Sequence, residues 1–168
     1  MQETPQQYIQ RMLGLVEGKE PVQVQKTTAE KLTKLLQGLD QQKFTRRPGT
    51  DKWSIAEILA HLADAEVVAA WRLRLVMGQN GATIQSFDQN AWAEAFNYQQ
   101  RDARASLETF RVLRASNLAL LESIPEKLWD NYGTHQERGK ETVTHIVSMY
   151  AGHDLNHLRQ VEAIVKGT

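Results

Sequence analysis

The sequence predicts an all-α protein, an up-and-down type four-helix bundle with short additional helices. Three observations lead to this fold class. Apolar residues recur at helical spacing in long segments, proline and glycine divide the chain into helix-length pieces, and no run of alternating β-branched residues is bounded by a hairpin dipeptide. The chain has 168 residues, the usual size of one domain, so we expect a single domain over residues 1–168.

Two helices are expected in the first quarter of the chain. Thr4 is a good N-cap and is followed by Pro5, which suits the first helical position, and this short helix ends at Gly18. A second helix runs from Pro21 to Asp40. Two consecutive threonines inside it mark a place where it could break, because β-branched side chains are stiff in a helix.

The clearest helix start lies after a short linker at residues 46–49. Ser54 and Glu57 are spaced as a capping box, and the helix that they begin ends at Gly78. Its apolar residues are separated by three or four positions and form one continuous stripe, which predicts a core-facing helix. The stripe consists of Ile58, Leu62, Ala65, Ala69, Leu73 and Val76.

The rest of the chain alternates between expected loops and helices. Residues 78–90 are expected to form a long loop, and residues 92–98 a brief aromatic helix or turn. A long helix over 101–124 is stopped by a proline, and a second loop covers 129–139. The last helix is expected over 141–165.

The composition excludes several classes of function. Lys and Arg number 20 and Asp and Glu also number 20, so nothing attracts the chain as a whole to phosphate backbones or anionic lipid. No apolar run reaches the length of a membrane span, and the polar start is unlike a signal peptide. We therefore expect a cytoplasmic protein with no nucleic-acid or membrane partner. The chain has no cysteine, so a metal site would need His, Asp or Glu ligands.

Three histidines are placed to face the core. His153 and His157 are four residues apart on the last helix, so they share one face. That face also carries an apolar stripe, which predicts that both imidazoles point inward. His61 lies three residues after Ile58 and four before Ala65, so it borders the buried stripe of its own helix.

Three buried imidazoles have two possible interpretations. They can be ordinary core residues with satisfied hydrogen bonds, or they can be the ligands of one metal ion. Neutral imidazole nitrogen binds zinc, nickel, copper or iron well, and the spacing of His153 and His157 lets both rings reach one ion. Three such ligands would leave an open position on the ion, where water becomes acidic enough to act as a nucleophile at neutral pH.

The remaining histidines and nearby charges are expected to be peripheral. His145 falls about 80° around the helix from His153, toward the flank, and His135 lies in a polar loop, where we expect it to be solvated. Arg72, Arg74, Asp64 and Glu66 are best explained as solvated or inter-helix charges, with the alternative that Asp64 orients His61.

Several motifs in order resemble those of the DinB/YfiT-like superfamily. They are the segments 53–66, 139–142 and 152–160, together with the opening 16–21, and the likeness extends from about Tyr8 to Val165. The resemblance implies a four-helix bundle, often a homodimer, with one divalent metal ion held by three histidines. Carried over residue by residue, these ligands are His61, His153 and His157. We favour zinc or nickel as the ion and keep iron, manganese and copper as alternatives.

The resemblance implies two activities and leaves a third possibility open. Members are described as metal-dependent hydrolases, and some are thiol S-transferases of a detoxifying kind. In the latter a low-molecular-weight thiol binds the metal and attacks an electrophile; here that thiol would be a cosubstrate, since the chain has no cysteine. The alternative is a non-catalytic metal-binding or dimerising bundle in which the ion is structural. A closed coordination sphere with a fourth protein ligand would favour that alternative.

Overall fold

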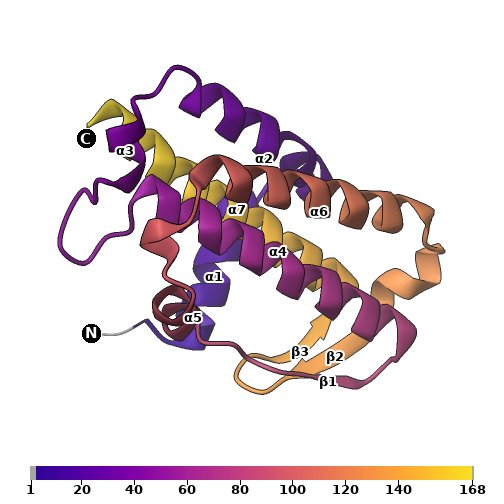
Figure 1. The fold of residues 1–168 in the computed structure, drawn as a ribbon. Coiled ribbons are helices and arrows are strands. Elements are labelled where there is room, and N and C mark those ends of the chain that lie inside the picture. Colours follow the sequence, from indigo (N-terminus) through magenta and orange to yellow (C-terminus); the bar gives the residue numbers. More distant parts are fainter. Residues whose placement is uncertain (1–2, 168) are drawn as a thin grey trace.

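The structure, a computed structural model, describes residues 3–167; residues 1, 2 and 168 of the predicted domain lie outside this range. The predicted four-helix bundle is confirmed (Figure 1). Its long helices are α2 (Pro21–Leu36), α4 (Ile55–Gly78), α6 (Ala103–Ser123) and α7 (Val143–Lys166). The shorter helices are α1 (Pro5–Val16), α3 (Gln41–Thr45), α5 (Gln89–Ala95) and the 3₁₀ turns Tyr98–Gln100 and Glu126–Asp130.

The helices of the bundle run as two parallel pairs, so they do not alternate in direction as the predicted up-and-down type would. Near the start of α2 and α7, Gln25 donates to the carbonyl oxygen of Val147, and further along, about one turn in α2 and two turns in α7, Thr28 donates to Asp154. These contacts require α2 and α7 to run the same way. The helices α4 and α6 also run the same way, because Arg114 of α6 binds Glu66, and Asn117, one turn later, binds both Glu66 and Arg74 further along α4. The residues between α4 and α6, 79–102, therefore form a crossover segment that returns along the bundle before α6 begins (Figure 1).

Local capping explains where the helices begin. Thr4 and Gln7 form a complete capping box at α1, and Ser54 and Glu57 form another at α4. The expected break in α2 is absent: Thr27 donates its hydroxyl to a carbonyl oxygen of the preceding turn, and Thr28 shares its single hydroxyl hydrogen between the carbonyl oxygen of Val24 and Asp154, without interrupting the helix. The second helix is also shorter than expected, since its last residue is Leu36.

A small sheet that the sequence analysis did not anticipate has its first two strands in the two expected loops and its third strand at the expected start of the last helix, which begins at Val143. Its strands are β1 (Ala82–Ile84), β2 (Tyr132–His135) and β3 (Gly139–Thr142), in the order β1-β2-β3. β1 pairs with β2 in parallel, and β2 pairs with β3 antiparallel. Close packing requires Gly133, because a Cβ atom there would lie 2.7 Å from the side chain of Ile84. The sheet closes one side of the bundle beside α4 and α7 (Figure 1).

A buried polar layer connects the four long helices. Arg114 of α6 makes two hydrogen bonds with Glu66 of α4, at 3.0 and 2.8 Å, and two with Asp154 of α7, at 2.5 and 3.0 Å. It also donates to the backbone oxygen of Gln25 on α2. Apolar clusters lie toward either end of the bundle from this layer. Within residues 3–167 no helix is both long and apolar enough to cross a membrane.

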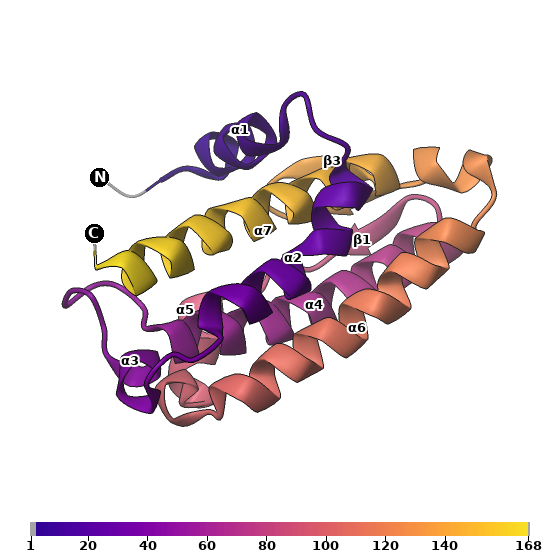
Figure 2. The same cartoon turned by 90° about the horizontal axis from the view of Figure 1, so that it is seen from above.

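The first helix lies against α7, on the opposite side from the rest of the bundle (Figure 2). The contact is close because Gly152 of α7 has no side chain. A Cβ atom at Gly152 would lie 2.1 Å from the backbone oxygen of Met12 on α1, a distance that real Cβ atoms do not show. The backbone of α1 can therefore approach α7 only because residue 152 is glycine.

Replacing Gly152 by alanine is expected to push α1 away from α7 and to lower the free energy of unfolding by about 1–3 kcal/mol. Chemical denaturation would measure the change. Gly14→Ala is the matched control, since a Cβ atom there has no neighbour within 4 Å. Alanine at that helical position should stabilise by about 0.5–1 kcal/mol. If the two variants were equally stable, the close approach of the α1 backbone to Gly152 would not limit the size of residue 152.

Candidate metal centre

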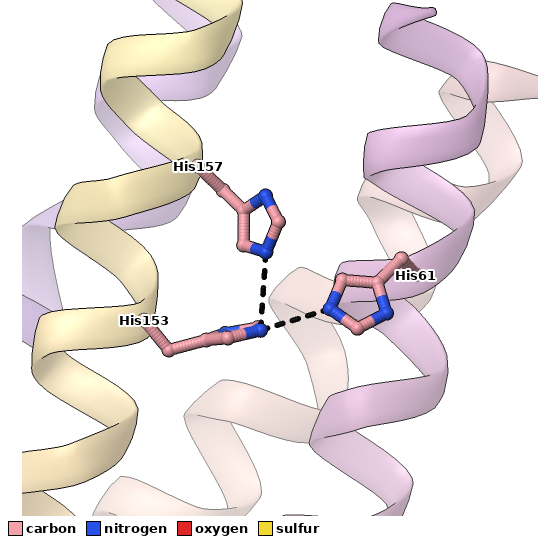
Figure 3. A group of neighbouring side chains, drawn as sticks. All are labelled: His61, His153 and His157. Atoms are coloured by element: carbon pink, nitrogen blue, oxygen red, sulfur yellow. Dashed lines mark hydrogen bonds between the residues drawn. The ribbon is translucent and has the colours of Figure 1, made fainter. Parts of the chain in front are cut away.

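Three histidines converge inside the bundle between α4 and α7 (Figure 3). His61 lies on α4, and His153 and His157 lie four residues apart on one face of α7. The two helices pack against each other, so their inward faces meet at this level. All three imidazoles are buried, with exposed fractions of 1%, 9% and 6%. The structure thus brings together the residues that the apolar stripes select.

The Nε2 atom of His153 is central to the cluster. It lies 2.8 Å from Nε2 of His61 and 3.1 Å from Nε2 of His157, and ligand atoms of the three residues all lie within 4.8 Å of one another. A neutral imidazole has only one N–H, so each ring that carries it on Nδ1 directs the lone pair of Nε2 into the shared space. Lone pairs from three imidazoles are the donor set that zinc and its neighbours bind, at about 2.0–2.1 Å.

The electrostatic environment keeps the three imidazoles neutral. Burial lowers the pKa of His61 and of His153 well below the usual value of 6.5, and the neighbouring imidazoles lower both pKa values further. Burial also lowers the pKa of His157 to about 4. A histidine with a pKa this low is uncharged at pH 7, and the uncharged imidazole is the form that binds a metal ion.

The hydrogen bonds of the outer ring nitrogens distinguish a ligand set from ordinary core histidines. Nδ1 of His157 lies 2.8 Å from the side-chain oxygen of Gln160, which accepts its hydrogen and leaves the lone pair on Nε2. The ring of His61 packs against Trp53, and its Nδ1 is buried with no hydrogen-bond partner among residues 3–167. A metal ion on Nε2 would not supply a partner for this Nδ1, so the evidence for a ligand set is the convergence of the three Nε2 atoms and the orienting contact of Gln160. The residues present therefore fit a metal ion.

A pocket of about 200 Å³ gives access to the cluster from one side. His61 and His153 both form part of its wall. The other walls come from the crossover segment, from the β2–β3 hairpin and from α1 and α7. Among its lining residues are Tyr8, Ala65, Arg72, His135, Arg138 and Tyr150.

His135 is not solvated, so that expectation is wrong. It lies on β2 with an exposed fraction of 1%, because its Nδ1 accepts the backbone N–H groups of Glu137 and Arg138 at 3.2 and 3.4 Å and the ring turns inward. Burial lowers its pKa to about 4. His135 lines the pocket but is not part of the three-histidine cluster. His145 also stays outside the cluster, as its position around α7 predicts.

The charged residues near the cluster have different roles from one another. Asp64 does not orient His61: it accepts the hydroxyl hydrogen of Tyr98 at 2.7 Å and pairs with Arg101 at 2.9 Å. The inter-helix interpretation is therefore right for Asp64. It is also right for Glu66, which binds Arg114 of α6, and for Arg74, which binds Asn117 of α6. Arg72 is buried and not solvated.

Two residues of the site were missed by the sequence analysis. Gln160 lies one turn after His157, and this spacing alone could have indicated a partner for the ring. Arg72 follows His61 by eleven residues, which returns it to within about 20° of the same helix face. This small angle could have indicated that Arg72 and His61 face the same pocket.

These features define a four-helix-bundle protein with a candidate centre for a divalent metal ion. A family model described as the DinB superfamily matches residues 25–161, most of the chain. The chain belongs to the DinB superfamily, and the resemblance identified from its motifs is confirmed.

Curated relatives carry names that propose a metal-dependent hydrolase. OB0782 of Oceanobacillus iheyensis is 25% identical over 114 residues, which cover 68% of this chain and 66% of that protein. OB0413 of the same organism is 25% identical over 140 residues, which cover 81% of this chain and 78% of that protein. These names support a metal-dependent function and leave the reaction open.

A solved structure shows the same fold. YfiT from Bacillus subtilis matches with a TM-score of 0.81 at 19% identity, over 87% of this chain and 84% of that chain. It is described as a candidate metal-dependent hydrolase with an unusual four-helix bundle topology.

Proposed function

We propose that His61, His153 and His157 hold one divalent metal ion and that the protein is a metal-dependent enzyme acting on a small molecule. The observation that carries this proposal is the position of three neutral imidazoles beside a pocket. Within residues 3–167 no carboxylate or further imidazole joins the group. Three protein ligands are the number that catalytic sites use, whereas structural sites are usually closed by four.

A divalent ion held by three neutral imidazoles supplies a Lewis acid that lowers the pKa of a water or thiol molecule bound to it. The chain itself supplies orientation and exclusion of solvent. Gln160 fixes the ring of His157, and Trp53 packs against the ring of His61. Burial of the three rings keeps bulk water away from one side of the site, so the pocket is the route by which a substrate reaches it.

Two reactions follow from this arrangement, hydrolysis and transfer of a thiol to an electrophile. The names of the curated relatives favour hydrolysis. The pocket equally suits a thiol cosubstrate, which the chain requires for transfer because it has no cysteine. Zinc and nickel suit the three nitrogen ligands, and iron, manganese and copper are further candidates.

The second candidate function, a bundle with a purely structural ion, has less support. The ionic layer of Arg114, Glu66 and Asp154 already connects α4, α6 and α7 without any ion. An ion at the histidines would add only a second link between α4 and α7. A structural role would therefore duplicate a connection that the bundle already has.

Cobalt substitution tests the open position. We expect the cobalt-loaded protein to develop a sulfur-to-metal charge-transfer band when it is titrated with 2-mercaptoethanol, because a thiolate would occupy a position that the protein leaves free. Visible absorption spectroscopy measures the band, and the metal content is determined on the same sample. Cobalt present with no band at saturating thiol, and with no change in coordination on addition of azide, would contradict an open site and favour the structural ion.

A further inference from the structure

Arg72 is a buried cation with no carboxylate partner. Its exposed fraction is 4%, and among residues 3–167 it forms no ion pair with Asp or Glu. Its Nη2 donates to the backbone oxygen of Gln85 at 2.8 Å, and its guanidinium carbon lies 5.7 Å from the ring centre of Phe87. Arg114, which is buried to the same degree, is bound by two carboxylates. One carbonyl and one aromatic ring offset only part of the cost of burying a full charge.

Where Arg72 and His135 approach each other, both facing nitrogen atoms are hydrogen-bond donors. Nη2 of Arg72 lies 3.4 Å from Nε2 of His135. Because Nδ1 of His135 accepts two backbone N–H groups, its single hydrogen is on Nε2. Both nitrogens therefore present hydrogens to each other and neither accepts. Among the described residues, these two N–H groups face the pocket with no hydrogen-bond acceptor between them.

Both donors lie in the pocket that reaches the histidine cluster. Arg72 and His61 are on one face of α4, three turns apart, with their Cα atoms separated by about 16 Å. Ala65 lies between them, and its short side chain leaves room along this face. The pocket thus has a three-histidine end and a cationic end.

Other charges of the pocket do not neutralise Arg72. Arg138 is bound by Glu141 through two hydrogen bonds, at 2.5 and 3.1 Å, so this pair contributes no net charge. Glu137 is exposed and forms no ion pair with Arg72 among the described residues. His135 is neutral, since burial lowers its pKa to about 4. Among the described residues that line the pocket, Arg72 is therefore the buried cation that no carboxylate binds, and its single charge matches a monoanion such as a carboxylate better than a doubly charged phosphate.

We propose that Arg72, together with His135, binds the carboxylate of an elongated small-molecule substrate whose reacting group lies at the three-histidine end. This inference rests on the proposed function and names its substrate class. The guanidinium fork matches a carboxylate geometrically, and an anion there would supply the acceptor that both donors lack. Arg72 is in this view a residue of specificity that acts on binding and not on the reacting atoms.

Matched pairs of thiols test the proposal on the cobalt-loaded protein. The probes are ω-mercaptoalkanoates of three, six and eight carbons and the mercaptoalcohols of the same lengths, and the charge-transfer band reports affinity. A charge-assisted hydrogen bond of about 1.5–3 kcal/mol predicts that the acid binds about 10- to 100-fold more tightly than the alcohol at one chain length at least. Arg72→Gln and Arg72→Met should remove this preference. Arg74→Gln should keep it, because Arg74 binds Ala70 and Asn117 outside the pocket.

Equal affinity for acid and alcohol at every length would overturn the role of Arg72 while the band itself still supported the open site. A preference that survives in both Arg72 variants would also overturn it. If neither class of thiol gives a band and azide leaves the coordination unchanged, the proposed function fails, and the metal-free protein decides on Arg72. In that case a shift of the Arg72 side-chain N–H resonance with hexanoate, and none with hexanol, supports the anion site. No shift with hexanoate overturns it.

Discussion

Replacing His153 by alanine is expected to abolish stoichiometric metal binding while the helices stay folded. Nε2 of His153 is the atom that both other histidines contact, at 2.8 and 3.1 Å, so its loss leaves two ligands with no common neighbour. Changes to residues that merely orient ligands cost 10- to 100-fold in metal affinity, so loss of a ligand should cost more than about 100-fold. The bundle should persist, because its apolar clusters and ionic layer do not involve this ring.

Metal analysis after dialysis, with far-ultraviolet circular dichroism on the same samples, measures both parts of this prediction. His145→Ala is the matched control, since His145 lies on the same helix and outside the cluster. The control should retain one ion per chain. Retention of stoichiometric metal by His153→Ala would place the ion elsewhere. Loss of helix together with the metal would favour a structural ion.

Replacing Arg114 by methionine is expected to be the most destabilising change in the bundle. The guanidinium is the only cation bound to Glu66 and Asp154 in the described part of the chain, and these carboxylates are 2% and 1% exposed. Removing it would leave two buried negative charges with neutral hydrogen-bond donors, Thr28 and Asn117, and no cation. Breaking a buried pair in this way costs about 3–5 kcal/mol in the free energy of unfolding.

Guanidinium denaturation would measure this loss. The triple variant Arg114→Met with Glu66→Gln and Asp154→Asn should recover most of the stability, because it removes both signs of charge from the layer. Arg111→Met serves as a surface control: Arg111 pairs with Glu108 on the exposed side of α6, and its replacement should have little effect. A single Arg114→Met variant as stable as the native protein would show that the layer contributes nothing to the fold.

The helices were predictable from sequence because their signals are local. The capping box of Ser54 and Glu57 and the three-and-four spacing of apolar residues depend only on neighbours within two turns. The same periodicity placed His61 and His153, which are far apart in sequence, on inward faces. Their convergence then required only that α4 and α7 pack together.

What could not be predicted depends on contacts between distant segments. β1 is three residues long and pairs with β2, so neither strand has an alternating pattern long enough to identify it. The burial of His135 depends on the turn that follows β2, whose backbone N–H groups its ring accepts. The parallel course of α4 and α6 depends on the path of the crossover segment, which no local pattern encodes.

Different segments of the chain carry the metal-binding histidines and form the opposite wall of the pocket. The histidines come from α4 and α7, which are held in register by the buried ionic layer. The opposite wall of the pocket comes from Ser86 and Phe87 in the crossover and from His135 on the hairpin. Substitutions or insertions in these connections can therefore change which molecule enters while the metal-binding helices stay as they are. A scaffold divided in this way can acquire new substrates in evolution, or by design, without rebuilding its reactive centre.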